Sequence, residues 1–407
     1  YNSIGSQRPY SWFKYFKEFE LEPIIVTRDW DKNIMTPLDY IKPSKSKTFT
    51  CEELPEGLIY RAPFKPNIRD SFIIRYGFSR YKTIRKLLTF FILLTEYHIS
   101  IFDSKQELFS LAKKVIEKHH ISYIIATGEP FILFKYAHNL SKKFNIPWIA
   151  DYRDCWSQNY TRSKIESLLF YHFEKKTLAT STRITTVSHE FAKRLSVLHN
   201  KSIDVIYNGF FEENFTEIQT QESQAVFTLS FAGTLYKYQP IEEIAEGIID
   251  FCTKKNTIVN VCFVGLNFYP EQATRVKEAF NSNLINLEIT ERLNHISALQ
   301  KLNKANILLL PSSPLFPQVY AKAFDYIALN KKILLFMPDN ATLEMIIKDC
   351  DLGLICYTKN DISKQIEQEY ENWKTNGNTK YISSAKQKYT RRIQTKKLTE
   401  IILSLPC

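Results

Sequence analysis

The chain has 407 residues, of which 44% are hydrophobic and 24% are charged. This length exceeds the size at which a single hydrophobic core keeps growing, so two domains are expected. The composition is that of an ordinary globular protein and excludes a largely disordered or low-complexity chain.

Cysteine usage and hydropathy predict a cytoplasmic protein. The seven cysteines form an odd set without the close pairs of a zinc ribbon or a thioredoxin motif, so a reducing compartment is expected. The first residues have neither the basic start nor the apolar run of a signal peptide. The longest apolar stretch, Leu87 to Leu94, falls short of the roughly 20 residues that cross a bilayer, so no transmembrane segment is expected.

The net charge of +11 is concentrated between residues 61 and 86, where a single acid, Asp70, stands among many bases. Those bases are Arg61, Lys65, Arg69, Arg75, Arg80, Lys82, Arg85 and Lys86. Aromatic residues lie among them and an apolar run follows. This mixture favours a face that rests on an anionic membrane surface, which would place the protein peripherally on the inner face of the plasma membrane. A solvated basic face and a nucleic-acid surface are the alternatives.

In the first half of the chain, short β-branched runs alternate with longer amphipathic segments, the pattern of a parallel sheet covered by helices. The predicted strands are Ile24 to Thr27, Tyr123 to Thr127, Trp148 to Asp151, Ile184 to Val187 and Asp204 to Tyr207. The predicted helices are Leu108 to His119, Phe131 to Phe144, Lys164 to Ala179 and Glu190 to Leu198. These elements predict a doubly wound, Rossmann-like domain over residues 1–215.

A polar stretch without periodicity, Gln219 to Gln224, is interpreted as the interdomain linker. A second alternating series then predicts another doubly wound domain over residues 216–382. Its strands are Thr228 to Ala232, Val259 to Val264, Ile307 to Pro311, Lys332 to Phe336 and Leu352 to Cys356. The tail, residues 383–407, is expected to be a helix that packs back on the first domain. The predicted fold class is therefore α/β, with two Rossmann-like parallel-sheet domains that face a cleft.

A glycine directly follows the first strand of the second domain, in Phe231-Ala232-Gly233-Thr234-Leu235-Tyr236. Glycine lets backbone N–H groups approach an anion closely, and a helix that starts near Pro240 adds its positive end. A tight turn between strand and helix explains the glycine equally well. Gly233 and Thr234 alone therefore do not establish a phosphate site.

A second polar cluster follows the predicted strand that ends at Pro311. Ser312 and Ser313 come first, and a helix from about Val319 places Lys322 and Asp325 on one face. A lysine can neutralise a diphosphate, and an acid one turn later can accept hydrogen bonds from two ribose hydroxyls. The pair fits a nucleoside diphosphate, with a surface ion pair between the two side chains as the alternative.

Charged residues also end two predicted strands of the first domain. Asp151, Arg153 and Asp154 follow one strand, and Glu129 follows the strand before it. Ligands of open parallel sheets bind at this edge, so one acid is expected to orient an acceptor hydroxyl. A buried network of Arg153 with one of the acids, and a simple turn at Glu129, are the alternatives.

In order and spacing, these motifs resemble those of the GT-B glycosyltransferases of the large retaining group called family 4, particularly its bacterial surface-polysaccharide members. The resemblance covers nearly the whole chain. It rests on Gly5-Ser6-Gln7-Arg8-Pro9, Ala150 to Trp156, Thr185 to Ser188, Val205 to Phe210 and the Gly233 and Lys322 motifs. It implies that the N-terminal domain receives a saccharide or lipid-linked acceptor and that the C-terminal domain holds a UDP- or GDP-linked sugar. Transfer with retained anomeric configuration and without a metal or other cofactor is also implied.

The resemblance further implies roles for individual residues. Lys322 and Lys237 stabilise the departing diphosphate, Asp325 binds ribose, and the segment Arg292 to His295 runs along the base and diphosphate. The predicted nucleotide-sugar-binding set is Gly233, Thr234, Lys237, Arg292, Ser312, Ser313, Val319, Lys322 and Asp325. The predicted catalytic residues are Asp151, Asp154 and Lys322, and the acceptor-side residues are Gly5, Glu129 and Arg153. Gly5 is expected in a loop before the first helix. Pro317 and Gln239 depart from the family pattern, so no sugar preference is implied.

Two other functions remain as alternatives. A sugar-nucleotide epimerase of the same fold would act on the donor alone. A basic nucleic-acid-binding protein is less favoured, because the bases cluster without a known binding module, so no nucleic acid partner is expected. Asp29-Trp30-Asp31 resembles the metal-binding acid pair of a different transferase fold, but it follows the wrong strand, so no metal site is predicted.

Overall fold

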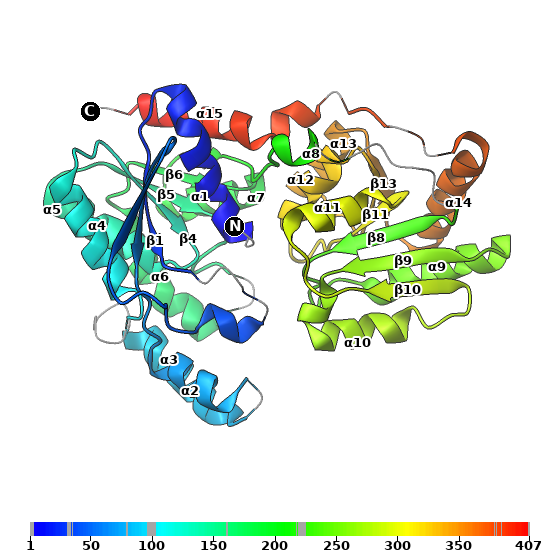
Figure 1. Ribbon diagram of the computed structural model, residues 1–407, viewed down its shortest axis with the longest axis horizontal. Coiled ribbons are helices and arrows are strands. Elements are labelled where there is room, and N and C mark those ends of the chain that lie inside the picture. Colours follow the sequence, from blue (N-terminus) through cyan, green and yellow to red (C-terminus); the bar gives the residue numbers. More distant parts are fainter. Residues whose placement is uncertain are drawn as a thin grey trace.

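The computed structural model describes residues 4–30, 34, 36–78, 80–95, 103–159, 162–216, 218, 225–377, 379, 381–383 and 385–405. Asp31, the expected linker Gln219 to Gln224 and Cys407 lie outside the described residues. Figure 1 shows two α/β halves side by side, with the C-terminal helix lying across the top of the first half. This arrangement confirms the predicted α/β class with parallel sheets.

The first half contains two sheets. Strands β4, β5, β6 and β7 form a parallel sheet in that order, and β1, β3 and β2 form a second sheet. Every residue of β5 is buried, as expected for a strand in the interior of a covered parallel sheet. The elements are α1 Ile4–Tyr15, β1 Ile24–Arg28, β2 Thr50–Leu54, β3 Gly57–Ala62, α2 Ile68–Tyr76, α3 Lys82–Thr95, α4 Gln106–Lys118, β4 Ile124–Gly128, α5 Ile132–Phe144, β5 Trp148–Tyr152, α6 Lys164–Leu178, β6 Arg183–Thr186, α7 His189–His199 and β7 Asp204–Val205.

The hairpin of β2 and β3 was not predicted from the sequence. These strands pair antiparallel, and β3 pairs in parallel with β1. Four of the five β2 residues are exposed, and their sequence Thr-Cys-Glu-Glu-Leu lacks the apolar alternation that identifies a half-buried strand. Backbone pairing to β3 therefore forms this strand without a hydrophobic signal.

The second half is one parallel sheet of six strands in the order β10-β9-β8-β11-β12-β13. This 3-2-1-4-5-6 order is that of a doubly wound sheet, and the two faces carry separate hydrophobic clusters. The edge strand β10 was not predicted, although its apolar residues alternate with exposed Asn286 and Glu288 as in a half-buried strand. The elements are α8 Glu213–Thr216, β8 Thr228–Ala232, α9 Ile241–Lys255, β9 Val259–Val264, α10 Pro270–Ala279, β10 Ile285–Ile289, α11 His295–Asn303, β11 Ile307–Pro311, α12 Ala321–Ala328, β12 Lys332–Phe336, α13 Thr342–Asp349, β13 Gly353–Cys356, α14 Lys359–Asn376 and α15 Arg391–Leu403.

The expectation that Gly5 lies in a loop before the first helix is wrong, because α1 begins at Ile4. Pro9 lies inside this helix and has no N–H to donate to the carbonyl group of Gly5, four residues earlier. That carbonyl oxygen instead accepts a hydrogen bond from Nη1 of Arg153 at 2.8 Å. The proline therefore leaves the Gly5 carbonyl oxygen available to the arginine that follows strand β5.

Two segments cross between the halves and hold each other. The amide of Phe210 donates to the carbonyl oxygen of Tyr389 at 3.1 Å, and the amide of Arg391 donates to the carbonyl oxygen of Phe210 at 2.8 Å. Beyond this crossing, Leu398 and Ile402 of α15 pack with Trp12 of α1 and its neighbours. Helix α15 thus follows the second half along the chain but packs on the first (Figure 1).

Helices α2 and α3 project from the first half, away from its sheets (Figure 1). They carry several large apolar side chains that are exposed, among them Leu87, which is 64% exposed, and Phe90, which is 46% exposed. Within the described residues, no helix combines the length and the apolar character needed to span a membrane.

The crossing predicts a specific cost for Gly209→Ala. Gly209 has φ +72°, and an added β-carbon would lie 2.6 Å from the carbonyl oxygen of Tyr389. Left-handed strain of about 1–3 kcal/mol then adds to a backbone clash, so urea unfolding should show a clear loss of stability. Gly377→Ala is the matched control, because Gly377 has φ +69° with nothing within 4 Å of the added carbon. Equal losses in the two variants would contradict the role of the crossing.

Candidate functional site

Lys322 and the turn after β8 meet at the carboxyl end of the second sheet. The ammonium group of Lys322 donates to the carbonyl oxygen of Thr234 at 2.9 Å, and it lies 3.7 Å from the centre of the Phe231 ring. Gly233 has φ +79°, and a β-carbon there would lie 3.9 Å from the lysine nitrogen. The structure thus brings together the two sequence motifs that were expected to hold a diphosphate.

The environment of Lys322 is unusual for a lysine. Within the described residues, no carboxylate forms an ion pair with it, and its recorded polar contact is a carbonyl oxygen. Burial lowers the pKa of Lys322 well below its ordinary value. An anion that arrived beside this nitrogen would supply the missing negative charge, so the site favours an anionic ligand.

Asp325 does not pair with Lys322, so the surface ion pair considered from the sequence is not formed. Its Oδ2 atom instead lies 3.0 Å from Nε2 of His295, the first residue of α11. Burial lowers the pKa of His295, but the hydrogen bond and the charge of Asp325 raise it further, so the net shift is upward. Sequence reasoning noted the segment that ends at His295 but gave this side chain no role of its own.

The other predicted donor-side residues lie in different environments. Lys237 is largely exposed and pairs with Glu271 at 3.5 Å, so it does not join Lys322. Arg292 lies 3.3 Å from the hydroxyl of Tyr40 in the first half. Val319 packs in a hydrophobic cluster of the second half.

Two serines and a glutamine complete the strand ends of this domain. The hydroxyl of Ser312 is buried and has no hydrogen-bond partner among the described residues, and that of Ser313 accepts from the Leu315 amide at 3.3 Å. Gln239 is buried, where its amide donates to the carbonyl oxygen of Pro311 at 2.7 Å and accepts from the Tyr236 amide at 2.8 Å. Gln239 therefore joins the ends of β8 and β11 instead of standing where a ligand could reach it.

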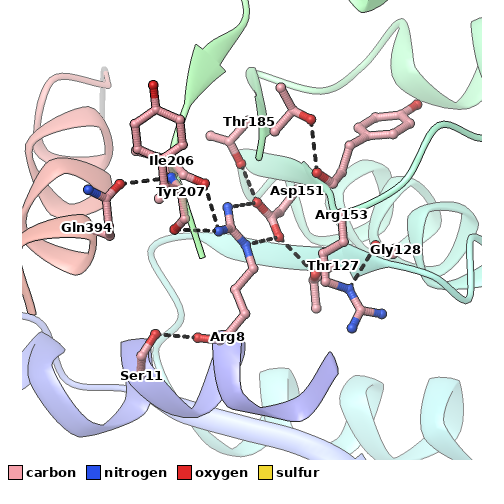
Figure 2. Close-up of polar contacts among 12 residues, drawn as sticks. Arg8, Ser11, Thr127, Gly128, Asp151, Arg153, Thr185, Ile206, Tyr207 and Gln394 are labelled. Carbon is pink, nitrogen blue, oxygen red and sulfur yellow. Dashed lines mark hydrogen bonds and ion pairs between the residues drawn. The ribbon is translucent and has the colours of Figure 1, made fainter. Parts of the chain in front are cut away.

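On the first half, Asp151 is fully buried in a polar network (Figure 2). Arg8 grips both carboxylate oxygens, with Nε at 2.9 Å and Nη2 at 2.6 Å. The hydroxyls of Thr127 and Thr185 also donate to this carboxylate, at 2.8 and 2.7 Å. Burial raises the pKa of Asp151, but the ion pair and these hydrogen bonds lower it to below its ordinary value. These contacts give Asp151 a scaffold role and leave it no oxygen for an acceptor.

Arg153 points along the same edge without an ion pair to either neighbouring acid. Its guanidinium donates to the carbonyl oxygens of Gly5, Gly128 and Glu129, at 2.8 Å and 3.0 Å for the first two. A buried network does form around Asp151, but its arginine is Arg8 and not Arg153, the residue that this alternative named. The loop of Glu129 is held against α1 through these bonds.

Asp154 faces the second half. Nε2 of Gln318 lies 3.4 Å from its Oδ1 atom, and the hydroxyl of Tyr238 donates to Oε1 of Gln318 at 3.1 Å. Burial and the charge of Glu129 raise the pKa of Asp154. This bridge was missed from the sequence, because no spacing rule relates Gln318 to an acid in the other half. It places Asp154 opposite the loop that follows β8.

A surface hollow of about 750 Å³ lies elsewhere on the second half. It is lined by one face of β8, β9 and β10 together with α11, including Ser230, Cys262 and Lys301. None of the predicted site residues lines it, and open α/β sheets bind ligands beyond the carboxyl ends of their strands rather than on this face. Among the described residues, no group of three or more His, Cys, Asp and Glu side chains is arranged to hold a metal ion.

Comparison with solved structures identifies the architecture. A glycosyltransferase from Rickettsia africae ESF-5 superposes with a TM-score of 0.64 at 14% identity, covering 100% of this chain and 97% of that one. Sucrose-phosphate synthase from Thermosynechococcus elongatus gives 0.61 at 11% identity, covering 96% and 91%. Anabaena HepE in complex with UDP-glucose gives 0.55 at 10% identity, covering 74% and 82%. The sequence matches no family model and no curated protein.

The fold is GT-B. The predicted fold class is therefore confirmed, and the two halves correspond to the two Rossmann-like domains of a GT-B protein. In a GT-B fold, the carboxyl ends of both sheets meet where the domains face each other. The bridge from Asp154 through Gln318 to Tyr238 lies at this meeting place.

Replacing Asp151 and Asp154 by asparagine should have different effects on the free energy of unfolding. Asp151→Asn leaves the Arg8 guanidinium buried without its counter-charge, which should cost about 3–5 kcal/mol in the free energy of unfolding. Asp154→Asn removes a charge that burial already disfavours, so stability should stay unchanged or rise slightly. Urea unfolding at pH 7 measures both.

Acid provides an independent check of this pair. Because the pKa of folded Asp151 lies below its ordinary value, the stabilisation is present at neutral pH and is lost as pH falls through the folded pKa. The difference in the free energy of unfolding between the parent and Asp151→Asn should therefore shrink at acid pH. A variant as stable as the parent at pH 7 would contradict the scaffold role.

Proposed function

We propose that this protein is a glycosyltransferase that moves a sugar from a nucleoside-diphosphate sugar, UDP- or GDP-linked, to a saccharide or lipid-linked acceptor. Its suggested place is bacterial surface-polysaccharide synthesis at the cytoplasmic face of the membrane. The observation that carries the proposal is the position of Lys322. Its nitrogen stands against the Gly233–Thr234 turn at the carboxyl end of β8 without an acidic partner among the described residues.

On the donor side, the diphosphate would lie between the Lys322 ammonium and the backbone of the Gly233 turn. As the bond to the sugar breaks, negative charge grows on the diphosphate, and a fixed positive group stabilises it more than the ground state. Asp325, on the same helix, would accept hydrogen bonds from the ribose. Ser312, whose buried hydroxyl has no partner among the described residues, stands at the end of the neighbouring strand β11.

On the acceptor side, we assign Asp154 in place of Asp151, because Asp154 lies 3.4 Å from Gln318, in the loop after β11 of the second half. A carboxylate whose pKa is raised by burial accepts the proton of the acceptor hydroxyl more readily than an ordinary carboxylate does. Arg153 would fix the loop of Glu129 and the start of α1, where Gly5 lies.

The charge needed for departure of the diphosphate is assigned to Lys322, so the proposed reaction requires neither a metal ion nor a cofactor. Retention of anomeric configuration is proposed from the family resemblance of the motifs. Metal independence can be tested by measuring sugar transfer with and without a chelator. The anomeric configuration of the product can be read by NMR.

The proposed partner of the exposed hairpin α2–α3 is an anionic membrane. Its exposed apolar side chains Ile84, Leu87 and Phe90 lie on a helix whose polar positions include Lys82 and Lys86. Among the described residues between 65 and 95, the only acid is Asp70, which is buried and already bonded to Arg69. Apolar insertion and charge attraction would therefore act together on anionic lipid.

Nucleotide binding should depend on Lys322. Thermal shift of the parent against UDP-, GDP-, ADP- and CMP-sugars should show stabilisation by one nucleotide class, because a ligand that binds only the folded state stabilises it. Lys322→Ala should lose that shift. Lys237→Ala is the matched control and should keep it, because Lys237 is exposed and pairs with Glu271.

No stabilisation by any nucleotide, or an equal shift in Lys322→Ala, would sink this site assignment. The epimerase alternative is separated by product analysis. An epimerase converts the sugar nucleotide without any acceptor, whereas the proposed transferase releases its nucleoside diphosphate only slowly until an acceptor is added.

Membrane binding should depend on both kinds of side chain in the hairpin. Combined Arg80→Gln, Lys82→Gln and Lys86→Gln removes three charges at about 1 kcal/mol each, so affinity for phosphatidylglycerol vesicles should fall about a hundredfold. Leu87→Gln with Phe90→Gln should also weaken flotation with these vesicles. The control pair is Ile165→Gln with Leu168→Gln, which are 67% and 65% exposed on α6.

Parent binding should fall as salt rises and should be weak on phosphatidylcholine vesicles. Equal flotation of the parent with both lipids would contradict the proposed membrane contact. A parent that forms dimers, with dimerisation lost in the hairpin variants, would show instead that the hairpin binds a second copy of the chain.

A further inference from the structure

One face of the second sheet is polar where β8, β9 and β10 lie side by side, although strands of a covered parallel sheet are ordinarily apolar on both faces. On the opposite face, the same strands pack apolar side chains into a hydrophobic cluster. Successive residues of a strand point to opposite faces, so the polar face is formed by every second residue. These residues line the hollow of about 750 Å³ and are Thr228 and Ser230 of β8, Asn260 and Cys262 of β9, and Asn286 and Glu288 of β10.

The strand register arranges these side chains in two rows. In the first row, Thr228, Asn260 and Asn286 stand opposite one another on the three strands. The Nδ2 atom of Asn286 donates to Oδ1 of Asn260 at 3.1 Å, and Nδ2 of Asn260 donates to Oγ1 of Thr228 at 3.4 Å. The first row is therefore a line of amide and hydroxyl groups that hold one another in place.

The second row consists of Ser230, Cys262 and Glu288. Glu288 is held in place by Lys301 of α11 at 2.5 Å and by the thiol of Cys262, which donates to it at 3.4 Å. Ser230 is fully buried, and its hydroxyl has no hydrogen-bond partner among the described residues. A buried hydroxyl without a partner opposes folding and calls for an explanation. A polar ligand in the hollow would supply that partner.

Helix α11 forms the other wall of the hollow, and exposed Gln300 and Lys304 lie at its rim. Among the described residues that line the hollow, none is aromatic, so a nucleobase would find no ring to stack on. Glu288 balances Lys301, and Lys304 adds one positive charge. Amide and hydroxyl groups together supply both donors and acceptors. This lining matches a ligand that carries many hydroxyl groups and little charge.

We propose that this hollow is a second binding site, separate from the donor site, and that its ligand is a short oligosaccharide. The volume of about 750 Å³ lies within the range of roughly 300–1,000 Å³ found for small-molecule sites. The lining shares no residue with the cluster of Lys322, Gly233 and Thr234 at the carboxyl end of β8. Saccharide binding here is therefore independent of nucleotide binding and does not require that the protein be a transferase.

The test is calorimetry of the full chain with maltotriose, cellotriose, chitotriose and trigalacturonic acid as probes. The hollow variants are Ser230→Ala and the combination of Asn286→Leu with Gln300→Leu. The matched control combines Asn360→Leu with Gln368→Leu. These two amide side chains are also exposed, but they lie on α14, which packs on the opposite face of the sheet.

The parent should bind at least one of the four probes, and each hollow variant should bind it about tenfold more weakly, because hydrogen bonds to the ligand are lost. The control should bind as the parent does. Ser230→Ala should resist urea at least as well as the parent, since it removes a buried hydroxyl without a partner. Weaker binding by this variant therefore cannot result from misfolding.

Nucleotide provides the second comparison. Saturating UDP, or the Lys322→Ala substitution, should leave saccharide binding unchanged, because Lys322 does not line the hollow. A parent that binds none of the four probes would show a hollow that holds water only and would overturn the inference. Equal affinity in Ser230→Ala and the control, or displacement of the saccharide by UDP, would overturn it as well. A parent that binds a saccharide but no nucleotide overturns the proposed function and leaves this inference standing.

Discussion

The buried ion pair of Arg8 with Asp151 is the interaction on which the first domain depends. The same guanidinium that grips Asp151 also donates to the carbonyl oxygens of Ile206 and Tyr207, at 2.8 and 3.1 Å. One side chain thereby joins α1, the centre of the parallel sheet and the segment that leaves for the second domain (Figure 2). A buried pair of this kind does not guarantee net stability, but it fixes a single arrangement of three segments that are far apart in the sequence.

The second constraint is the double crossing between the domains. Phe210 and Arg391 exchange backbone bonds with each other's segment, and Gly209 is the residue that permits their close approach. The segment that leaves the first domain and the segment that returns to it are hydrogen-bonded to each other here. The two connections between the domains therefore form a single junction. The edges that carry Asp154 and Lys322 are therefore presented to each other by backbone bonds made outside the site.

The sequence predicted the elements with strong periodicity and the motifs at their ends. The strand before Gly233 and the helix of Lys322 follow local rules, and the two motifs meet as expected. Strand β2 escaped prediction because a hairpin edge needs only backbone pairing. The partners of Asp151, Asp154 and Asp325 also escaped, since Arg8, Gln318 and His295 reach them by tertiary contacts that no spacing encodes.

In this molecule, a buried charged group with a partner supports the fold, whereas a charged group without a partner marks the candidate site. Asp151 is as deeply buried as any polar group in the described chain, yet all its oxygens are bonded, so nothing is left for a ligand. Arg391 is also buried and Lys322 is partly buried, but neither forms an ion pair with an acid among the described residues. Burial of an unpaired cation opposes folding. An anionic ligand would offset that cost at Lys322, which is why the unpaired ammonium group marks a binding site and the paired Asp151 does not.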